Sequence, residues 1–185
     1  SYLITLEKEI EGSENESNKQ ELLKRLSGKW FEYKQPHIAG FYAEKVAEIE
    51  NTPIAWSIVG TTFASAFKSK SEKKVKDYAL GKAIGAFENA ISLDPEDIKH
   101  KVNLALCYVE YPPQDNPMKG ILQFINLNKD NPDNPLVLTN IGRLAIQKGQ
   151  YDKAIQRLVR PVEIEPEIKT VNCLLSKVNS QTRNK

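Results

Sequence analysis

Apolar residues recur at helical spacing along most of the chain. Leu22, Leu26 and Trp30 stand four residues apart, which places them on one face of a helix expected over residues 18–33. The same period predicts another helix over residues 40–50. No segment of four or more residues alternates convincingly between apolar and polar positions, so the pattern predicts no strand. We therefore expect an all-α fold.

Prolines mark several predicted helix starts. Each follows a residue whose side-chain oxygen can cap a helix, and proline is tolerated at the first helical position because the N–H that it lacks would be unbonded there. A further cap is expected at Ser17, which forms a capping box with Gln20. The cap-proline pairs are Thr52-Pro53, Asp94-Pro95, Asn116-Pro117 and Asn134-Pro135.

The chain also has an internal period. Pro132 and Pro166 lie 34 residues apart, and Pro95 precedes Pro132 by 37. Before each of these prolines stands a helical segment with small and large apolar residues, and ahead of it stands another helical segment. Because such a pair of helices leaves one apolar face uncovered, successive pairs must stack. The period therefore predicts an α-solenoid of antiparallel helix pairs.

Small residues mark where the helices of each pair approach one another. Gly60, Ala105 and Gly142 follow apolar residues in the first helices and allow the backbone of the facing helix to come close. In the second helices we expect small residues to do the same and large ones to fill the space between pairs. The small residues are Ala83, Gly120 and Ala154, and the large ones are Phe87, Phe124 and Leu158.

This pattern resembles the tetratricopeptide repeat (TPR), a 34-residue unit with an aromatic residue, Leu-Gly, Tyr, and then Ala, Phe, Ala and Pro. The resemblance covers about residues 53–166. It implies a right-handed superhelix that binds a peptide or protein in a concave groove. The best-matched unit carries Ile141-Gly142, Gly149 at the turn, Tyr151, Ala154, Leu158 and Pro166.

The resemblance also divides the chain. Residues 1–52 are expected to form N-terminal helices, with a diverged repeat at 18–50. Residues 53–166 are expected to form three pairs, and residues 167–185 a capping helix and a tail. The three pairs are 53–95, with an insertion at about 68–78, 96–132 and 133–166.

One proline departs from the repeat pattern. Pro161 stands where the family has Ala, and a proline inside a helix removes a backbone hydrogen bond at a cost of about 3 kcal/mol. We therefore expect a kink or an early helix end near Arg157–Pro161.

Charge favours neither nucleic acid nor membrane. The chain has 26 Lys+Arg and 24 Asp+Glu, a formal net charge of +2. A Lys-rich run at 68–76 suggests nucleic-acid binding as a weaker alternative, but no aromatic residues interleave the lysines. The longest charge-free stretch, residues 52–67, is shorter than the roughly 18–20 residues of a membrane-spanning helix, so we expect a buried helix there. The chain begins Ser1-Tyr2, so an upstream signal or anchor stays open, with the cytoplasm as the default location.

Few residues suit catalysis or metal binding. His37 and His100 are the only histidines, and we expect both at the surface. Cys107 and Cys173 form no CxxC motif and are expected to be small core or inter-helix residues. HExxH, GxSxG and phosphate-loop motifs do not occur. We predict no enzyme activity, no metal and no cofactor.

The resemblance to TPR proteins implies a binding groove lined by first-helix residues. Asn103 and Asn140 would present side-chain amides to the backbone of an extended peptide, and Arg143 and Lys177 would favour an acidic segment. The predicted groove residues, with Val102 and Leu106 for apolar contact, are Ser57, Thr61, Lys99, Val102, Asn103, Leu106, Thr139, Asn140, Arg143, Gln147 and Lys177.

Two functions from different classes follow. The first is a non-enzymatic scaffold that binds a peptide or protein partner, whose identity the sequence does not give. The second is self-assembly into a homo-oligomer, either by stacking at the C-terminal end or by packing Leu22, Leu23 and Trp30 of the N-terminal helices into a neighbour's groove.

Overall fold

The computed structural model describes residues 2–67 and 72–183, with side chains to residue 181. Over these residues it contains ten helices and no strand, so the predicted all-α class is confirmed. The chain divides into two compact units, residues 1–112 and residues 113–185.

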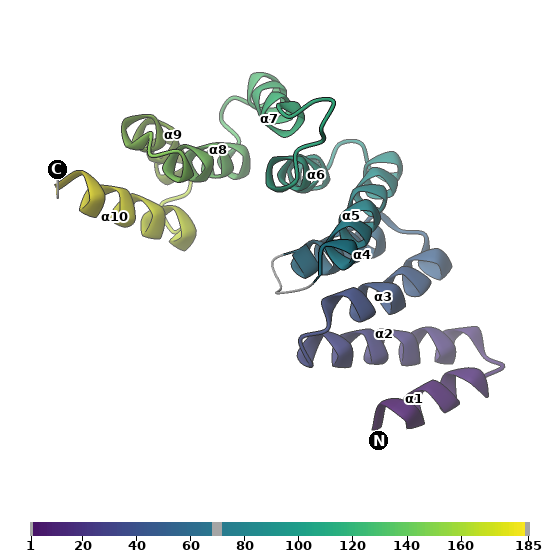
Figure 1. Cartoon of the computed structure of the whole chain (residues 1–185). Coiled ribbons are helices and arrows are strands. Elements are labelled where there is room, and N and C mark those ends of the chain that lie inside the picture. The colour runs from purple at the N-terminus through teal and green to yellow at the C-terminus, as the bar shows by residue number, and fades with distance from the viewer. Residues whose placement is uncertain (1, 68–71, 184–185) are drawn as a thin grey trace. The chain divides into compact units, whose positions relative to one another are not determined.

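In unit 1, each helix packs against the next one along the chain, and α4 also contacts α6 (Figure 1). This succession is typical of stacked helix pairs. The helices of unit 1 are α1 (Tyr2–Glu11), α2 (Glu16–Glu32), α3 (Pro36–Glu50), α4 (Pro53–Phe67), α5 (Lys73–Leu93) and α6 (Ile98–Glu110).

The helices of unit 2 are also arranged in succession. Its consecutive helices pack against one another, and α8 also contacts α10. Because α6 lies in unit 1 and α7 in unit 2, the pairing of residues 96–132 as one repeat stays a prediction. The helices of unit 2 are α7 (Lys119–Asp130), α8 (Pro135–Gln147), α9 (Tyr151–Ile164) and α10 (Lys169–Arg183).

Two of the four predicted cap-proline pairs start helices. Thr52 Oγ1 accepts a hydrogen bond from the backbone N–H of Ala55 at 3.2 Å, and α4 begins at Pro53. Asn134 Oδ1 accepts from the N–H groups of Leu136 and Val137, at 3.0 and 3.2 Å, and α8 begins at Pro135. These side chains satisfy N–H groups that have no partner within the helix.

The other two pairs form turns. Asp94 Oδ1 accepts from the N–H groups of Glu96 and Asp97, both at 3.2 Å, and α6 starts later, capped by Asp97. Asn116 precedes a turn that ends in Lys119, where α7 begins. Asp and Asn bond to nearby backbone in turns as readily as at helix starts, so the dipeptide alone does not separate the two cases.

The start of α2 also differs from the prediction. The helix begins at Glu16, and Asn15 caps it by accepting from the N–H of Asn18 at 3.1 Å. Ser17 and Gln20 therefore lie inside the helix, because an equally good cap stands two residues earlier. His37, expected in a surface loop, lies in the first turn of α3 and is half-buried.

Glycines set the closest approaches between helices. A Cβ added to Gly60 would lie 2.6 Å from the ring of Phe87, and one added to Gly142 would lie 2.6 Å from Leu158. Both glycines mark a close approach as expected, but the group that each admits is a large side chain of the facing helix and not its backbone. Gly40 meets Phe63 in the same way, at 2.8 Å, a contact that the sequence analysis missed. A helical glycine costs about 1 kcal/mol relative to alanine, and burying a large apolar side chain offsets this by about 1.5–3 kcal/mol.

The long helix α5 takes in part of the predicted insertion. Lys73 to Tyr78 form its first turns, and the ring of Tyr78 packs edge-on against Phe63 with 5.9 Å between centroids. Residues 68–71 lie outside the described residues. In this part of the chain the extra residues therefore lengthen a helix.

The expected early end at Pro161 is wrong. Helix α9 continues through Pro161 to Ile164, and the N–H of Glu165 donates to the Pro161 carbonyl at 2.8 Å. The proline ring is fully buried, and this burial offsets part of the hydrogen bond that proline cannot make.

The N-terminal helix is tied to the two helices that follow it. Leu6 of α1 is buried in a cluster with Leu22 and Leu26 of α2. The hydroxyl of Tyr42 on α3 donates to Glu7 Oε1 of α1 at 3.0 Å. Burial and this hydrogen bond raise the pKa of Tyr42 to about 12.

Alanine at Gly60 should destabilise the protein. The new methyl group would clash with the buried Phe87 ring, and overpacking of this kind typically costs about 1–3 kcal/mol. Gly81→Ala is the matched control, since nothing lies within 4 Å of its added Cβ; it should raise the free energy of unfolding by about 0.5–1 kcal/mol. Urea unfolding followed by circular dichroism measures both, and equal effects of the two substitutions would contradict the packing account.

Tyr42 should make stability depend on pH in the alkaline range. Its pKa is raised from 10.0 to about 12 in the folded state, so the stabilisation is complete below pH 10 and is lost as the pH rises to 12. Tyr42→Phe should show a shallower loss of stability over this range, whereas Tyr33→Phe, at an exposed position, should follow the parent protein. Urea midpoints between pH 9 and 12 test this, and parallel curves for all three proteins would rule it out.

Candidate functional site

The predicted groove residues lie on α4 and α6 of unit 1 and on α8 and α10 of unit 2. Helices α4 and α6 are in contact, and so are α8 and α10. The structure therefore brings these residues together as two sets, one in each unit. A single groove formed by both sets stays a prediction.

In unit 1, most of the predicted residues are accessible. Thr61 and Lys99 are exposed, and Ser57, Asn103 and Leu106 are half-buried. Val102 is only 2% exposed, so its side chain supports the core and offers little surface to a ligand.

In unit 2, the amide of Asn140 is already used. Asn140 is 8% exposed, and its Nδ2 donates to the Leu136 carbonyl at 2.8 Å, while its Oδ1 accepts from Arg143 Nη2 at 2.9 Å. This side chain orients Arg143 and is poorly placed to bond a peptide backbone. Gln147 and Lys177 are exposed, and Thr139 and Arg143 are half-buried.

Helix α4 carries an exposed apolar strip that the sequence analysis missed. Ile54 is 72% exposed and Ile58 53% exposed, and Thr61 follows them at helical spacing. We call these three residues the α4 strip. The expectation of a buried helix over 52–67 holds for one side only, the side that carries Val59 and Phe63. The signal was present in the sequence as two isoleucines four residues apart in a charge-free stretch.

The hydroxyl groups of Thr61, within the α4 strip, and of Thr62 and Ser65 near it are turned back onto their own helix. Thr61 Oγ1 lies 3.0 Å from the carbonyls of Ser57 and Ile58, and Thr62 Oγ1 donates to the Ile58 carbonyl at 2.7 Å. Ser65 Oγ donates to the Thr61 carbonyl at 3.1 Å. Such bonds within a helix satisfy the hydroxyl donors, and the hydroxyl oxygens keep only acceptor capacity.

Corresponding positions of α4 and α6 share one face. Ile54 lies six residues before Gly60, and Lys99 lies six residues before Ala105, the small residues that mark the same position in the repeat. Helices α4 and α6 are in contact, and the repeat register predicts that the α4 strip and Lys99 belong to one surface. We call it the α4–α6 face.

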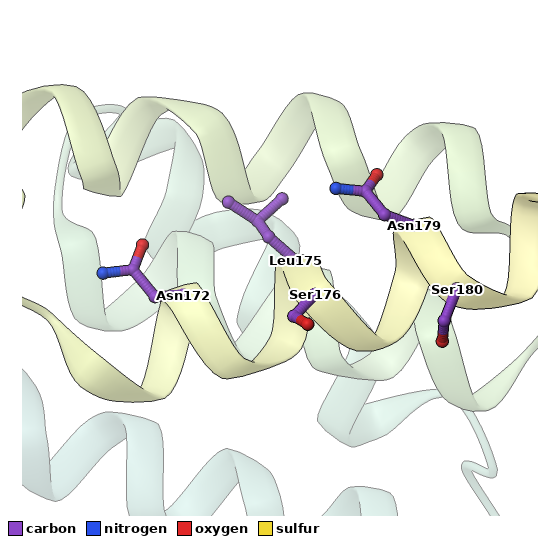
Figure 2. A pocket seen from close by; sticks show the side chains of 5 residues that line it. All are labelled: Asn172, Leu175, Ser176, Asn179 and Ser180. Atoms are coloured by element: carbon purple, nitrogen blue, oxygen red, sulfur yellow. The ribbon is translucent and has the colours of Figure 1, made fainter.

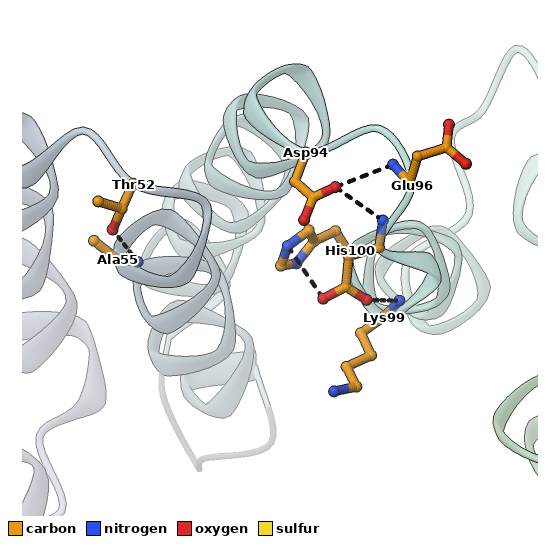
Figure 3. A network of polar contacts seen from close by, with 7 residues as sticks. Thr52, Ala55, Asp94, Glu96, Lys99 and His100 are labelled. Atoms are coloured by element: carbon orange, nitrogen blue, oxygen red, sulfur yellow. Dashed lines mark hydrogen bonds and ion pairs between the residues drawn. The ribbon is translucent and has the colours of Figure 1, made fainter.

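The start of α6 is held by a network of acidic side chains (Figure 3). Asp97 Oδ1 accepts from the N–H of Lys99 at 2.8 Å, and Asp97 Oδ2 lies 3.6 Å from His100 Nε2. His100, expected at the surface, is only 4% exposed, because its ring turns inward in the first turn of the helix. The Lys99 side chain points away from this network (Figure 3).

The outer face of α10 is polar. Val171 and Val178 are fully buried, and five other residues of α10 line a hollow of about 490 Å³. Their amide and hydroxyl groups suit contact with water, as a capping helix requires, and the capping role stays a prediction. Figure 2 shows the residues that line the hollow, Asn172, Leu175, Ser176, Asn179 and Ser180.

The structure also bears on the cysteines, on metal binding and on membrane helices. Cys107 is buried as expected, whereas Cys173 is exposed on α10. In the described part of the chain, no cluster of three or more His, Cys, Asp or Glu residues is suited to hold a metal ion. Among residues 2–67 and 72–183, no helix has the length and apolar character needed to cross a membrane.

Solved structures share this arrangement of helices. A thermophilic TPR protein from Thermus thermophilus superimposes with a TM-score of 0.67 at 13% identity, over 95% of this chain and 88% of that one. The chain has the fold of TPR proteins. The predicted right-handed α-solenoid is thereby confirmed. No protein-family model and no curated protein matches the sequence.

Two other TPR-like structures are similar. MamA from Desulfovibrio magneticus RS-1 has a TM-score of 0.54 and 15% identity, over 89% of this chain and 85% of that one. The human IFIT1 dimer with m7Gppp-AAAA has a TM-score of 0.68 and 18% identity, over 97% of this chain and 43% of the IFIT1 chain. At 15% and 18% identity, these similarities show the fold alone.

Proposed function

We propose that the protein is a non-enzymatic scaffold that binds a peptide or protein partner through the open faces of its first helices. The observation that carries the proposal is the α4 strip, in which Ile54 and Ile58 are 72% and 53% exposed. An exposed cluster of apolar residues beside a polar rim is typical of a protein-binding surface. The TPR-type fold supports the same conclusion.

The two units offer different chemistry. In unit 1, the α4 strip supplies apolar contact, and Lys99 and Asn103 supply polar contact at its edge. In unit 2, Arg143, Gln147 and Lys177 supply polar and cationic contact, with Thr139 beside them. Arg143 is fixed by Asn140 at 2.9 Å, and a pre-oriented guanidinium favours carboxylate groups on a partner.

Substitutions on the proposed binding faces should release partner proteins. Affinity capture from the native cell extract, quantified by mass spectrometry, compares the parent protein with Thr61→Arg in unit 1 and Arg143→Glu in unit 2. We expect at least one specific partner to fall about tenfold or more with one of these variants, since interface hot spots contribute about 2 kcal/mol or more. Asn89→Arg, at an exposed position on α5, should retain every partner. Unchanged capture by both face variants would contradict the proposal.

Self-association is the second candidate function. The proposed packing through Leu22 and Leu23 finds no support, because both are buried within unit 1 at 4% and 3% exposure. Helix α1 instead carries the exposed apolar residue Ile4, at 52% exposure. An exposed apolar residue of this kind suits contact with a second copy, and one of the similar structures is a dimer.

Dilution separates self-association from partner binding. If copies associate through α1, the average mass from light scattering should fall towards the 20.9 kDa of one chain on dilution, and Ile4→Glu should give that mass at every concentration. The control Ile49→Glu places the same charge on α3, at a position 42% exposed, and should leave the mass unchanged. A single-chain mass for the parent protein at high concentration would remove this candidate.

Nucleic-acid binding stays a weaker alternative. Residues 68–71 of the Lys-rich run lie outside the described residues, and Lys73 and Lys74 are exposed in the first turn of α5. IFIT1 was solved with m7Gppp-AAAA, which keeps this alternative open for the fold. The apolar, uncharged α4 strip favours a protein partner, because nucleic-acid surfaces are strongly charged.

A further inference from the structure

We propose that a second copy of this chain binds to helix α7, so that the α7 helices of two copies pack antiparallel about a two-fold axis. The contact surface is a strip of exposed apolar side chains, Met118, Leu122 and Ile125, which we call the α7 strip. By the repeat register, α7 is a second helix, whereas the proposed binding faces lie on first helices. The inference therefore goes beyond the proposed scaffold function and leaves those faces free.

The α7 strip is the uncovered side of its helix. In chain order, its three side chains are 53%, 47% and 55% exposed. The buried residues of the same helix are Gly120, Phe124 and Leu127. Each buried residue stands two positions after a strip residue, which is about 200° around a helix of 3.6 residues per turn. The apolar strip and the buried side are therefore on opposite sides of α7.

The repeat itself does not require an apolar strip. Gly120 on α7 is equivalent in the repeat to Ala83 on α5 and Ala154 on α9, so the strip positions can be compared among these three helices. The residues at those positions are Gly81, Gly85 and Glu88 on α5, and Asp152, Gln156 and Val159 on α9. Of the three helices, α7 alone is apolar at every strip position. One such strip in a chain suits a closed pair of copies, because each copy offers the same surface to the other.

The spacing of the strip suits packing against an identical helix. Met118, Leu122 and Ile125 are followed by Lys129, and the intervals between these four residues are four, three and four. Alternating intervals of three and four form the seam along which two helices pack lengthwise. The Leu122 N–H donates to the Met118 carbonyl at 2.9 Å, so Met118 lies on the helical path although α7 begins at Lys119. The apolar part of the seam is about 10 Å long at 1.5 Å per residue.

Opposite charges stand at the two ends of the α7 strip. Asp115 precedes Met118 by three residues, in the turn before α7, and Lys129 follows Ile125 by four. Both charged side chains are exposed, and within the described residues neither takes part in an ion pair. An antiparallel pair brings each Asp115 to Lys129 of the other copy, whereas a parallel pair would bring like charges together.

The apolar and the charged positions share one centre. Leu122 is the midpoint between Asp115 and Lys129, and the midpoint between Met118 and Ile125 lies half a residue before Leu122. A two-fold axis beside Leu122 therefore packs this leucine on its own symmetry copy and pairs the charges at both ends at the same time. An isologous contact requires a self-complementary surface of this kind. This self-complementarity favours a second copy over a different protein as the occupant.

Light scattering of the full chain over a dilution series tests the proposal. At high concentration the average mass should approach twice the 20.9 kDa of one chain. It should fall on dilution, because the strip is smaller than the roughly 800 Å² per partner of a stable interface. Leu122→Glu places two like charges at the axis and should give the single-chain mass at every concentration. The control Val159→Glu, at a 42% exposed position of α9, should behave as the parent protein does.

Exchange of the two charges tests the antiparallel arrangement. Asp115→Lys and Lys129→Glu should each raise the dissociation constant of the dimer several-fold, because each brings like charges together at both ends of the contact. The double variant exchanges the charges and should restore the parent value. In a parallel pair neither the single substitutions nor their combination would show this pattern, so a double variant without rescue would overturn the antiparallel packing.

Further variants separate this contact from other associations. A dimer that survives Ile4→Glu and is lost with Leu122→Glu uses the α7 strip, and the reverse pattern would place the contact on α1 and overturn the proposal. A parent protein that stays a single chain at high concentration would also overturn it, and capture of a cellular partner that Leu122→Glu then releases would identify a different protein as the occupant. Unaltered circular dichroism shows that each variant is folded. Partners that depend on Thr61 or Arg143 test the scaffold function separately, and their capture does not bear on the α7 strip.

Discussion

The structure depends on close contact between a helix backbone and one large side chain of the neighbouring helix. Gly60 against Phe87, Gly142 against Leu158 and Gly40 against Phe63 each leave no room for a methyl group. The contact fixes how near two helices lie and which of their faces meet. Each helix packs one face against its neighbours, so another face stays exposed. The side chains on that exposed face decide what the protein can bind.

Helix α4 shows this division most clearly. Its buried side is filled by Val59 and Phe63, both 0% exposed, and its open side carries two exposed isoleucines and hydroxyls bonded to the helix itself. A charge-free helix is usually read as wholly buried. In α4 the absence of charge suits both sides of the helix. The buried side packs in the core, and the exposed side carries no charged group whose removal from water would be costly.

Sequence alone predicted the features that depend on local pattern. The all-helical class, the roles of Gly60 and Gly142 and the caps at Thr52 and Asn134 follow from spacing and residue type. The same rules failed at Asp94 and Asn116, because a capping side chain followed by proline fits a turn as well as a helix start. Asp97, three residues after Asp94, is the residue that caps the start of α6.

The candidate site was harder to predict because exposure depends on neighbouring helices. Asn140 and Asn103 look equivalent in the repeat, yet Asn140 is buried and bonded to Leu136 and Arg143. Val102 and Ser57 also share a position, and only Val102 is fully covered. The repeat register places these residues on helices α4, α6, α8 and α10, but which side chains reach solvent is set by packing that the sequence does not display. The exposed side of α4 in unit 1 is therefore apolar, whereas the accessible groove residues of unit 2 are polar to cationic.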